Sequence, residues 1–363
     1  MNCASFVAFS AQDFEFIYAA PSAILRHPNV DALIFPMPYV LLISGIAGLL
    51  LGGTALVRGA SGIARGFKVS PMLVGLTVVA FGTSTPELVV NITGALKGET
   101  DLAFGNAVGS NLANFGLVLG IAAVLSPIYL EGQVVRREVP FLLLITAILM
   151  VMAADEPLSG TLSLLDRGDA VVLVLLFTVF VYFMVRDVMQ ESGDPVLREA
   201  ETFPAASKDS AMSRRHMLRD IFLVLTGLSL LTVGGQLTIE QGAIIAELHS
   251  ISQVVVGIFV VAVGTSLPEM VTSAIAAYKK EADLALGNIV GSNIFNSLVV
   301  LPAAGLIRPL PIPPGGLLDL AVGFAFVLVL IPLFLFSSAR IGRREGVALL
   351  LAYFCYLVYR FSA

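Results

Sequence analysis

The chain has 363 residues, of which 57% are hydrophobic and 13% are charged, and its mean hydropathy is +0.92. Soluble domains carry about 25% charged residues, so this composition excludes an ordinary soluble protein, and its hydrophobicity excludes disorder. The two cysteines, Cys3 and Cys355, lie at opposite ends of the chain and give no disulfide framework. The three histidines are widely separated, so the sequence offers no zinc or iron cluster, and any metal must be bound by oxygen. The composition predicts an all-α membrane protein.

Apolar stretches of the length of a membrane-spanning helix recur along the chain. A bilayer core of roughly 30 Å is crossed by about 20 helical residues. Ten such stretches cover residues 38–58, 70–96, 100–126, 137–154, 168–185, 219–239, 252–278, 283–306, 317–337 and 345–361. They predict ten transmembrane helices. An N-terminal extension, residues 1–36, lacks the order of a signal peptide, and a polar linker, residues 187–218, lies in the middle of the chain.

The basic residues are unevenly distributed over the predicted loops. Sixteen of the 21 lysines and arginines fall on the side that includes the linker, and five fall on the other side. Cytoplasmic loops of membrane proteins carry an excess of Lys and Arg. We therefore expect a multi-pass protein of the cell inner (cytoplasmic) membrane with a cytoplasmic linker and both termini outside. Its expected partners are membrane lipid and inorganic cations, not nucleic acid.

The sequence contains a strong internal repeat. Residues 74–119 align without gaps with residues 256–301, at a constant offset of 182, and 26 of the 46 positions are identical. The paired motifs are GTSTPE at 82–87 with GTSLPE at 264–269, and GNAVGSNLAN at 105–114 with GNIVGSNIFN at 287–296.

The repeat divides the chain into two halves, residues 37–186 and residues 219–363, with five predicted spans in each. Because five is an odd number, the second half inserts upside down relative to the first. This arrangement predicts two inverted five-helix repeats, an architecture typical of secondary transporters.

Glu87 and Glu269 are the acids of the first motif pair, and both lie within otherwise apolar spans. An unpaired carboxylate inside a bilayer is costly and usually has a function. The structural alternative is a carboxylate paired with Lys or Arg. That alternative is weak, because neither span has an internal basic residue and both halves keep the acid. The pattern favours a functional site.

Pro86 and Pro268 directly precede these glutamates. A proline inside a helix removes a backbone hydrogen bond and clashes with the preceding turn, so nearby carbonyls lose their donors. Such carbonyls beside a carboxylate form an oxygen site for a cation. A simple proline kink is the alternative, but its occurrence twice, each time next to a glutamate, favours the site.

Helical spacing adds polar side chains to the same faces, because residues three and four apart are neighbours. They are Thr83, Ser84 and Asn91 with Thr265, Ser266 and Ser273, and, on the following spans, Asn106, Ser110 and Asn114 with Asn288, Ser292 and Asn296. Carboxylate, hydroxyl and amide oxygens suit Ca2+, Mg2+ or Na+. Interhelical hydrogen bonding is an equally good interpretation for Asn106, Asn111, Asn288 and Asn293.

Two GxxxG steps lie within the second motif pair, Gly105 with Gly109 and Gly287 with Gly291. Such steps let helix backbones approach closely. We interpret them as packing positions that bring the polar faces of neighbouring spans together.

Two buried glutamates also indicate a mechanism. An empty site holds two negative charges, which Ca2+ or more than one Na+ neutralises. Because the empty site crosses the membrane unfavourably, a carrier of this kind changes sides only when loaded. The charges predict an exchanger and not a leak.

At these motifs the sequence resembles the calcium/cation antiporter superfamily, specifically its prokaryotic sodium/calcium exchanger branch. The resemblance covers both motif pairs and the ten-span layout from about Met37 onward. It implies the sodium/calcium exchanger fold, with ions bound between the repeats near the bilayer midplane. By motif position, it implies a calcium site of Glu87 and Glu269 with the carbonyls of Thr83 and Thr265. It further implies sodium sites from Ala80, Ser84, Ser110, Ala262, Ser266 and Ser292, with Asn114 and Asn296 nearby.

The expected activity is therefore secondary active exchange of Ca2+ for Na+ by alternating access, with no enzymatic reaction and no cofactor. Some family members have Asp at the position of Asn296, whereas this chain has Asn in both halves, which leaves the coupling ion open. A proton-coupled exchanger of Ca2+ or another divalent cation is the alternative. An intramembrane protease is disfavoured, because equivalent acids in both halves fit a symmetric ion site better than a one-sided active site.

Overall fold

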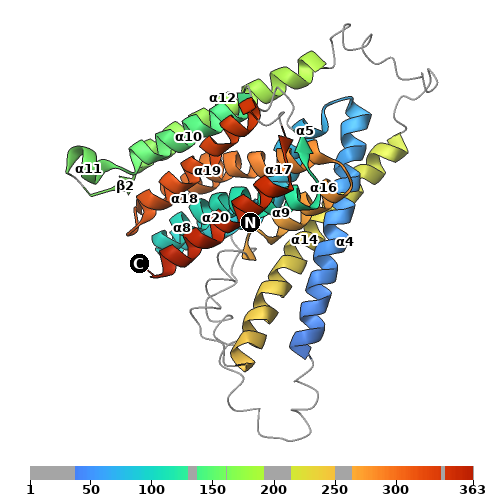
Figure 1. Cartoon of the computed structure of the whole chain (residues 1–363), viewed down its shortest axis with the longest axis horizontal. Coiled ribbons are helices and arrows are strands. Elements are labelled where there is room, and N and C mark those ends of the chain that lie inside the picture. The colour runs from blue at the N-terminus through green and yellow to red at the C-terminus, as the bar shows by residue number, and fades with distance from the viewer. Residues whose placement is uncertain are drawn as a thin grey trace, which may run out of the picture.

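The computed structural model describes residues 37–129, 137–160, 162–191, 214–249, 264–336 and 340–362. The described part is almost wholly helical (Figure 1). Its first half contains α4 (Met37–Phe67), α5 (Pro71–Val74), the π-helix η1 (Gly75–Val79), α6 (Ala80–Thr83), α7 (Thr85–Lys97), α8 (Thr100–Ala113), the π-helix η2 (Asn114–Val118), α9 (Leu119–Leu125), β1 (Ile128–Tyr129), α10 (Val139–Met152), α11 (Asp155–Ser159), β2 (Leu164–Leu165) and α12 (Arg167–Glu191). Its second half contains α14 (Arg214–Leu248), α16 (Leu267–Tyr278), α17 (Ala282–Phe295), the π-helix η4 (Asn296–Val300), α18 (Leu301–Ile307), β3 (Leu310–Pro311), α19 (Gly316–Phe336), β4 (Arg340–Ile341) and α20 (Arg343–Ser362).

The sequence repeat recurs in the secondary structure. The series from α7 to β1 is followed, 182 residues later, by the series from α16 to β3, and the bounds agree to within one residue. The strands pair across the halves, because β1 is antiparallel to β4 and β2 is antiparallel to β3. Each two-stranded sheet thus ties a segment of one half to a segment of the other.

Fewer spans are recognised by length and apolarity than the ten we expect. Within the described residues, five helical segments qualify, and a sixth is added if the bent pair Pro71–Thr83 and Thr85–Lys97 is one span. The helices Val139–Met152 and Gly316–Pro332 are apolar but shorter. Most of the first half of the expected span 252–278 lies outside the described residues. The ten-span layout therefore stays a prediction.

Three helices extend several residues beyond the apolar pattern. α4 continues nine residues beyond the expected end at residue 58, to Phe67, and α14 extends from Arg214 to Leu248. α12 also continues to Glu191, so both ends of the expected linker 187–218 are helical, and residues 192–213 lie outside the described part. Hydropathy marks only the apolar middle of such helices, and the polar end of α4 packs against α14, where Gly59 lies next to Val224 and Gly62 next to Asp220.

α4 and α14 lie side by side and project from the rest of the molecule (Figure 1). They run antiparallel, because Gly45 faces Thr238, Gly52 faces Leu231 and Gly59 faces Val224. A Cβ built on Gly52 would lie 2.8 Å from the Leu231 nitrogen. Only glycine permits this backbone approach, which is the small-residue packing typical of membrane helices.

α17 and its continuation to Ile307 form the most buried of these five helical segments. In the apolar stretch of Ala282–Ile307, 94% of the residues are buried. A Cβ on Gly287 would lie 2.5 Å from the Met72 carbonyl oxygen, and one on Gly291 would lie 2.7 Å from that of Leu76. The predicted packing role of this GxxxG step is confirmed. For Gly105 and Gly109, no described heavy atom comes within 4 Å of a built Cβ, and the repeat partners of α5 and η1 lie outside the described residues.

Candidate functional site

Each glutamate motif lies at a break between two helical segments. α6 ends at Thr83 and α7 begins at Thr85, with a bend of 43° between the helices on either side. The intervening Ser84 has φ −87° and ψ 9°, and Ser266 before α16 has nearly the same values, φ −84° and ψ 7°. Because proline has no N–H to donate, the helix does not continue unbroken through Pro86 or Pro268. The expected interruption is present in both halves.

The two glutamates lie in the first turn after each break, and both are buried, with 0% and 1% exposure for Glu87 and Glu269. Neither forms an ion pair with any lysine, arginine or histidine among the described residues. Burial of an unpaired carboxylate is unfavourable unless another group compensates its charge. The structural alternative of a paired carboxylate therefore has no support in the described part of the chain.

Hydroxyl groups of one half meet the polar residues of the other. The Ser84 hydroxyl donates to Glu269 Oε1 at 2.9 Å, and the Thr83 hydroxyl donates to Asn288 Oδ1 at 3.1 Å. Because Ser84 lies one helical turn before Glu87, the first contact brings the two glutamate motifs together. A further contact joins the second glutamate motif to the first half, because the hydroxyls of Thr265 and Ser110 are 3.3 Å apart.

Two asparagines fix the helices that carry the glutamates. Asn106 Nδ2 donates to the Glu87 carbonyl at 3.4 Å and to Asn91 Oδ1 at 2.6 Å. In the second half, Asn288 Nδ2 donates to the Glu269 carbonyl at 3.4 Å and to the Ser273 hydroxyl at 2.9 Å. Asn106 and Asn288 thus form the interhelical hydrogen bonds that the sequence analysis set against a role in cation binding.

Several buried polar atoms at this place have no hydrogen-bond partner among the described residues. They are both carboxylate oxygens of Glu87, Oε2 of Glu269, the hydroxyls of Ser266, Thr272 and Ser292, and both side-chain polar atoms of Asn114 and Asn296. Buried polar groups in proteins are almost always satisfied. Three of these atoms are carboxylate oxygens of the two glutamates, so a ligand that supplies positive charge would satisfy them.

Asn114 and Asn296 each begin a π-helix, η2 and η4. Both side chains are fully buried. Short π-helical turns inside α-helices occur frequently at functional sites. The internal repeat and the helical spacing of polar residues predict that these asparagines lie near the site, but they do not predict the π-helices.

The structure places the remaining predicted residues as follows. Ala80 is buried at the start of α6, and its carbonyl accepts from the Ser84 N–H at 3.0 Å and the Thr83 hydroxyl at 3.3 Å. Ala262 lies outside the described residues. Thr265 is half-buried, and Ser110 and Ser292 are buried on α8 and α17. Of the predicted ligands that the structure describes, Thr83, Ser84, Ser110, Thr265 and Glu269 take part in contacts that join the halves.

Ser297 takes part in a contact between the halves and was not among the predicted residues. Asn111 Nδ2 donates to the Ser297 hydroxyl at 2.9 Å. The repeat could not reveal Ser297, because the equivalent position in the first half is Phe115. Asn293, the repeat partner of Asn111, instead donates to the Ile289 carbonyl of its own helix at 2.7 Å.

The donor set of the site is entirely oxygen-based. Within the described residues, no group of three or more His, Cys, Asp or Glu side chains could hold a metal ion. Two carboxylates with hydroxyls, amides and carbonyls instead suit a hard cation. Such a buried site between two halves of a helical membrane protein is typical of a cation transporter.

Comparison with known proteins agrees with this class. Residues 37–186 and 220–362 match the model of the sodium/calcium exchanger protein family. CaxA of Alkalimonas amylolytica, which is named as an antiporter, is 37% identical over 335 residues, covering 89% of this chain and 98% of CaxA. The sodium/calcium exchanger MaX1 of Methanosarcina acetivorans is 31% identical over 344 residues, covering 89% and 98%. The chain belongs to the sodium/calcium exchanger family.

The fold is also that of a solved member. A structure of the sodium-calcium exchanger NCX_Mj superposes with a TM-score of 0.74 at 30% sequence identity, covering 89% of this chain and 98% of NCX_Mj. The all-helical exchanger fold and the membrane-transport class expected from the sequence are confirmed.

Proposed function

We propose that the chain is a secondary active antiporter that exchanges Ca2+ for Na+. Its cations bind between the two halves at Glu87 and Glu269. The further proposed ligands are Thr83, Thr265, Ser84, Ser266, Ser110, Ser292, Asn114, Asn296, Ala80 and Ala262. The observation that carries the proposal is the burial of Glu87, whose carboxylate oxygens both lack a partner among the described residues, next to contacts that join the halves.

Charge balance explains why this site exchanges ions. In the described part of the chain the two buried carboxylates have no basic partner, so the empty site is doubly negative, and moving such charge through a membrane is costly. One Ca2+, or more than one Na+, removes the penalty. The carrier therefore changes sides only when loaded, so a downhill flow of Na+ drives Ca2+ in the other direction.

The proposed architecture is ten transmembrane helices in two inverted five-helix repeats. Support comes from the agreement of element bounds at the offset of 182, the antiparallel pair α4 and α14, and the reciprocal strand pairs. The proposed location is the cytoplasmic membrane, with the linker inside and both termini outside, as the uneven distribution of Lys and Arg indicates.

The proposal is tested by Ca2+ uptake into vesicles that contain the purified full chain. We expect uptake when the vesicles are loaded with Na+ and diluted into Na+-free medium, and little uptake with a proton gradient alone. Uptake driven only by protons would show that the proton-coupled alternative is correct. Rapid Ca2+ flow without any gradient of a second ion would contradict an exchanger.

A further inference from the structure

A polar cavity lies at the basic end of α4 and includes none of the residues of the two glutamate motifs. It has a volume of about 410 Å³ and is formed by α4, α14 and the turn between α16 and α17. Its lining consists of Val57, Arg58, Ser61, Arg65, Arg219, Asp220, Leu223, Lys279 and Glu281. None of these residues belongs to the proposed cation site.

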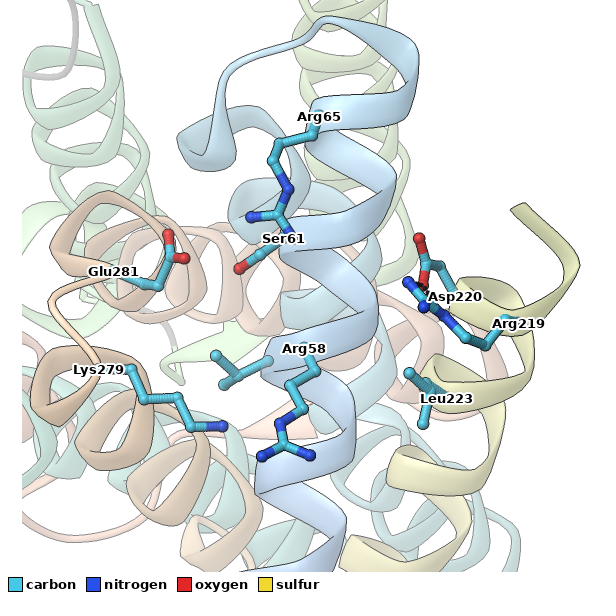
Figure 2. Close-up of a pocket in the computed structure, with 9 residues that line it drawn as sticks. Arg58, Ser61, Arg65, Arg219, Asp220, Leu223, Lys279 and Glu281 are labelled. Carbon is cyan, nitrogen blue, oxygen red and sulfur yellow. Dashed lines mark hydrogen bonds and ion pairs between the residues drawn. The ribbon is translucent and has the colours of Figure 1, made fainter. Parts of the chain in front are cut away.

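Three side chains of one helix face define the cavity. Arg58, Ser61 and Arg65 are three and four residues apart, so they follow one another along one face of α4. Figure 2 shows them in this order, with Lys279 and Glu281 on one side and Arg219 and Asp220 on the other.

The cavity has an excess of positive charge. Arg219 is paired with Asp220 at 2.8 Å, and the Asp220 carboxylate is buried against Gly62 of α4. The remaining charges are three cations, Arg58, Arg65 and Lys279, against the single acid Glu281. Neither Arg58 nor Arg65 has an ion pair within the described residues.

Two further observations point to an anionic ligand. The Ser61 hydroxyl lines the cavity, is 5% exposed, and has no hydrogen-bond partner among the described residues. Burial, followed by the nearby charge of Arg58, lowers the pKa of Lys279, which lies just beyond the end of α16. A bound anion favours the charged form of Lys279, and it accepts a hydrogen bond from the Ser61 hydroxyl.

The surroundings favour an anion that belongs to a lipid. The cavity also contains the apolar side chains Val57 and Leu223. Next to these lining residues, α14 exposes apolar side chains on one face, with Leu218 at 56% and Phe222 at 67% exposure. Apolar side chains offer no favourable contact to a soluble anion, whereas the acyl chains of a lipid pack against them. Basic pockets between membrane helices on the cytoplasmic side bind acidic headgroups.

We propose that this cavity binds the phosphate headgroup of an anionic phospholipid, with Arg58, Arg65 and Lys279 as its cationic ligands and Ser61 as a hydrogen-bond donor. The bound lipid bridges α4 and α14 to the α16–α17 turn. The proposal uses the membrane location of the chain and the side assigned to its basic loops, and it is independent of which ions are exchanged.

Native mass spectrometry of the purified full chain tests this proposal. The probes are phosphatidylglycerol and phosphatidylcholine, offered at equal concentration. We expect the wild type to retain phosphatidylglycerol preferentially and the double variant Arg58→Gln/Arg65→Gln to bind it about 30-fold more weakly, because each arginine contributes roughly fivefold. The matched control is Arg343→Gln/Arg344→Gln, which removes two exposed arginines at the start of α20 and should bind as the wild type does.

Three results would overturn the proposal: equal retention of both lipids by the wild type, an equal loss in the control, or full displacement of phosphatidylglycerol by inorganic phosphate. The last result would assign the cavity to a soluble anion. Size-exclusion profiles and helical circular dichroism check that each variant is folded. The single variant Arg65→Glu supplies a second test, since a reversed charge at an exposed position should weaken retention further than Arg65→Gln does.

Discussion

Glu87 and Glu269 occupy equivalent positions of the repeat, yet their partners differ. Ser84 donates to Glu269, whereas the equivalent Ser266 hydroxyl and both Glu87 oxygens are unpartnered among the described residues. Two nearly identical sequence motifs therefore adopt different hydrogen-bonding states within one molecule. In an alternating-access carrier, such an asymmetry distinguishes the two faces of the site.

Removal of either carboxylate charge should abolish transport. We expect Glu87→Gln and Glu269→Gln each to lower Na+-driven Ca2+ uptake by at least about a hundredfold, because loss of one charge leaves Ca2+ uncompensated in a low-dielectric site. Uptake into vesicles with matched protein content measures the effect. Glu156→Gln, which changes an exposed acid on α11, is the control and should leave uptake unchanged. Normal uptake by Glu87→Gln would remove that residue from the site.

The asparagines behind the glutamates should contribute mainly to stability. Asn288→Leu removes the amide that donates to the buried Ser273 hydroxyl and to the Glu269 carbonyl, which costs roughly 1–3 kcal/mol. We expect a lower melting temperature in detergent. Thr178→Val is the comparison, because that exposed hydroxyl bonds only to the Val174 carbonyl of its own helix. An unchanged melting temperature for Asn288→Leu would contradict a positioning role.

At the scale of elements, close helix contacts decide where the site lies. α17 reaches α5 and η1 only because Gly287 and Gly291 have no side chain. The contact brings Asn288 within reach of Thr83, which then joins the halves. The packing glycines thus control the geometry of the polar cluster without contributing a ligand.

A methyl group at this contact should be poorly tolerated. In Gly291→Ala the new Cβ would lie 2.7 Å from both the Leu76 carbonyl oxygen and the Ala80 Cβ. Overpacking of this kind costs typically about 1–3 kcal/mol. In Gly323→Ala on α19 the nearest atom, Leu112 Cδ2, is 3.7 Å away, so this variant should be neutral or slightly stabilising. Thermal unfolding in detergent compares the two, and equal melting temperatures would refute the contact.

At the scale of the whole molecule, the proposed orientation rests on the uneven distribution of the basic residues. A membrane-impermeant maleimide applied to intact cells tests it in a background with Cys3→Ser and Cys355→Ser. We expect Glu156→Cys on α11 to be labelled from outside and Arg344→Cys at the start of α20 to be protected until the cells are opened. The reverse pattern would invert the proposed orientation and move the basic cavity to the outer face.

Sequence reasoning predicted the all-helical exchanger fold, because the repeat keeps both motif pairs. Identity at Thr83 and Thr265, or Ser110 and Ser292, identifies paired positions without a structure. It could not show that Ser84 contacts Glu269, because a repeat relates residues by equivalence and not by proximity. Contacts such as Asn111 with Ser297, and the pairing of β1 with β4, depend on how the two halves meet. Hydropathy likewise left the polar ends of α4 and α14 outside the predicted spans.

The central claim is that one site, built around Glu87 and Glu269, binds both Ca2+ and Na+. Equilibrium binding of 45Ca2+ to the purified full chain, titrated with Na+ and separately with choline, tests it most directly. We expect Na+ to displace Ca2+ completely, choline to displace none, and Glu269→Gln to bind little Ca2+ at any Na+ concentration. Ca2+ binding that is insensitive to Na+, or undiminished in Glu269→Gln, would contradict a shared site between the two halves.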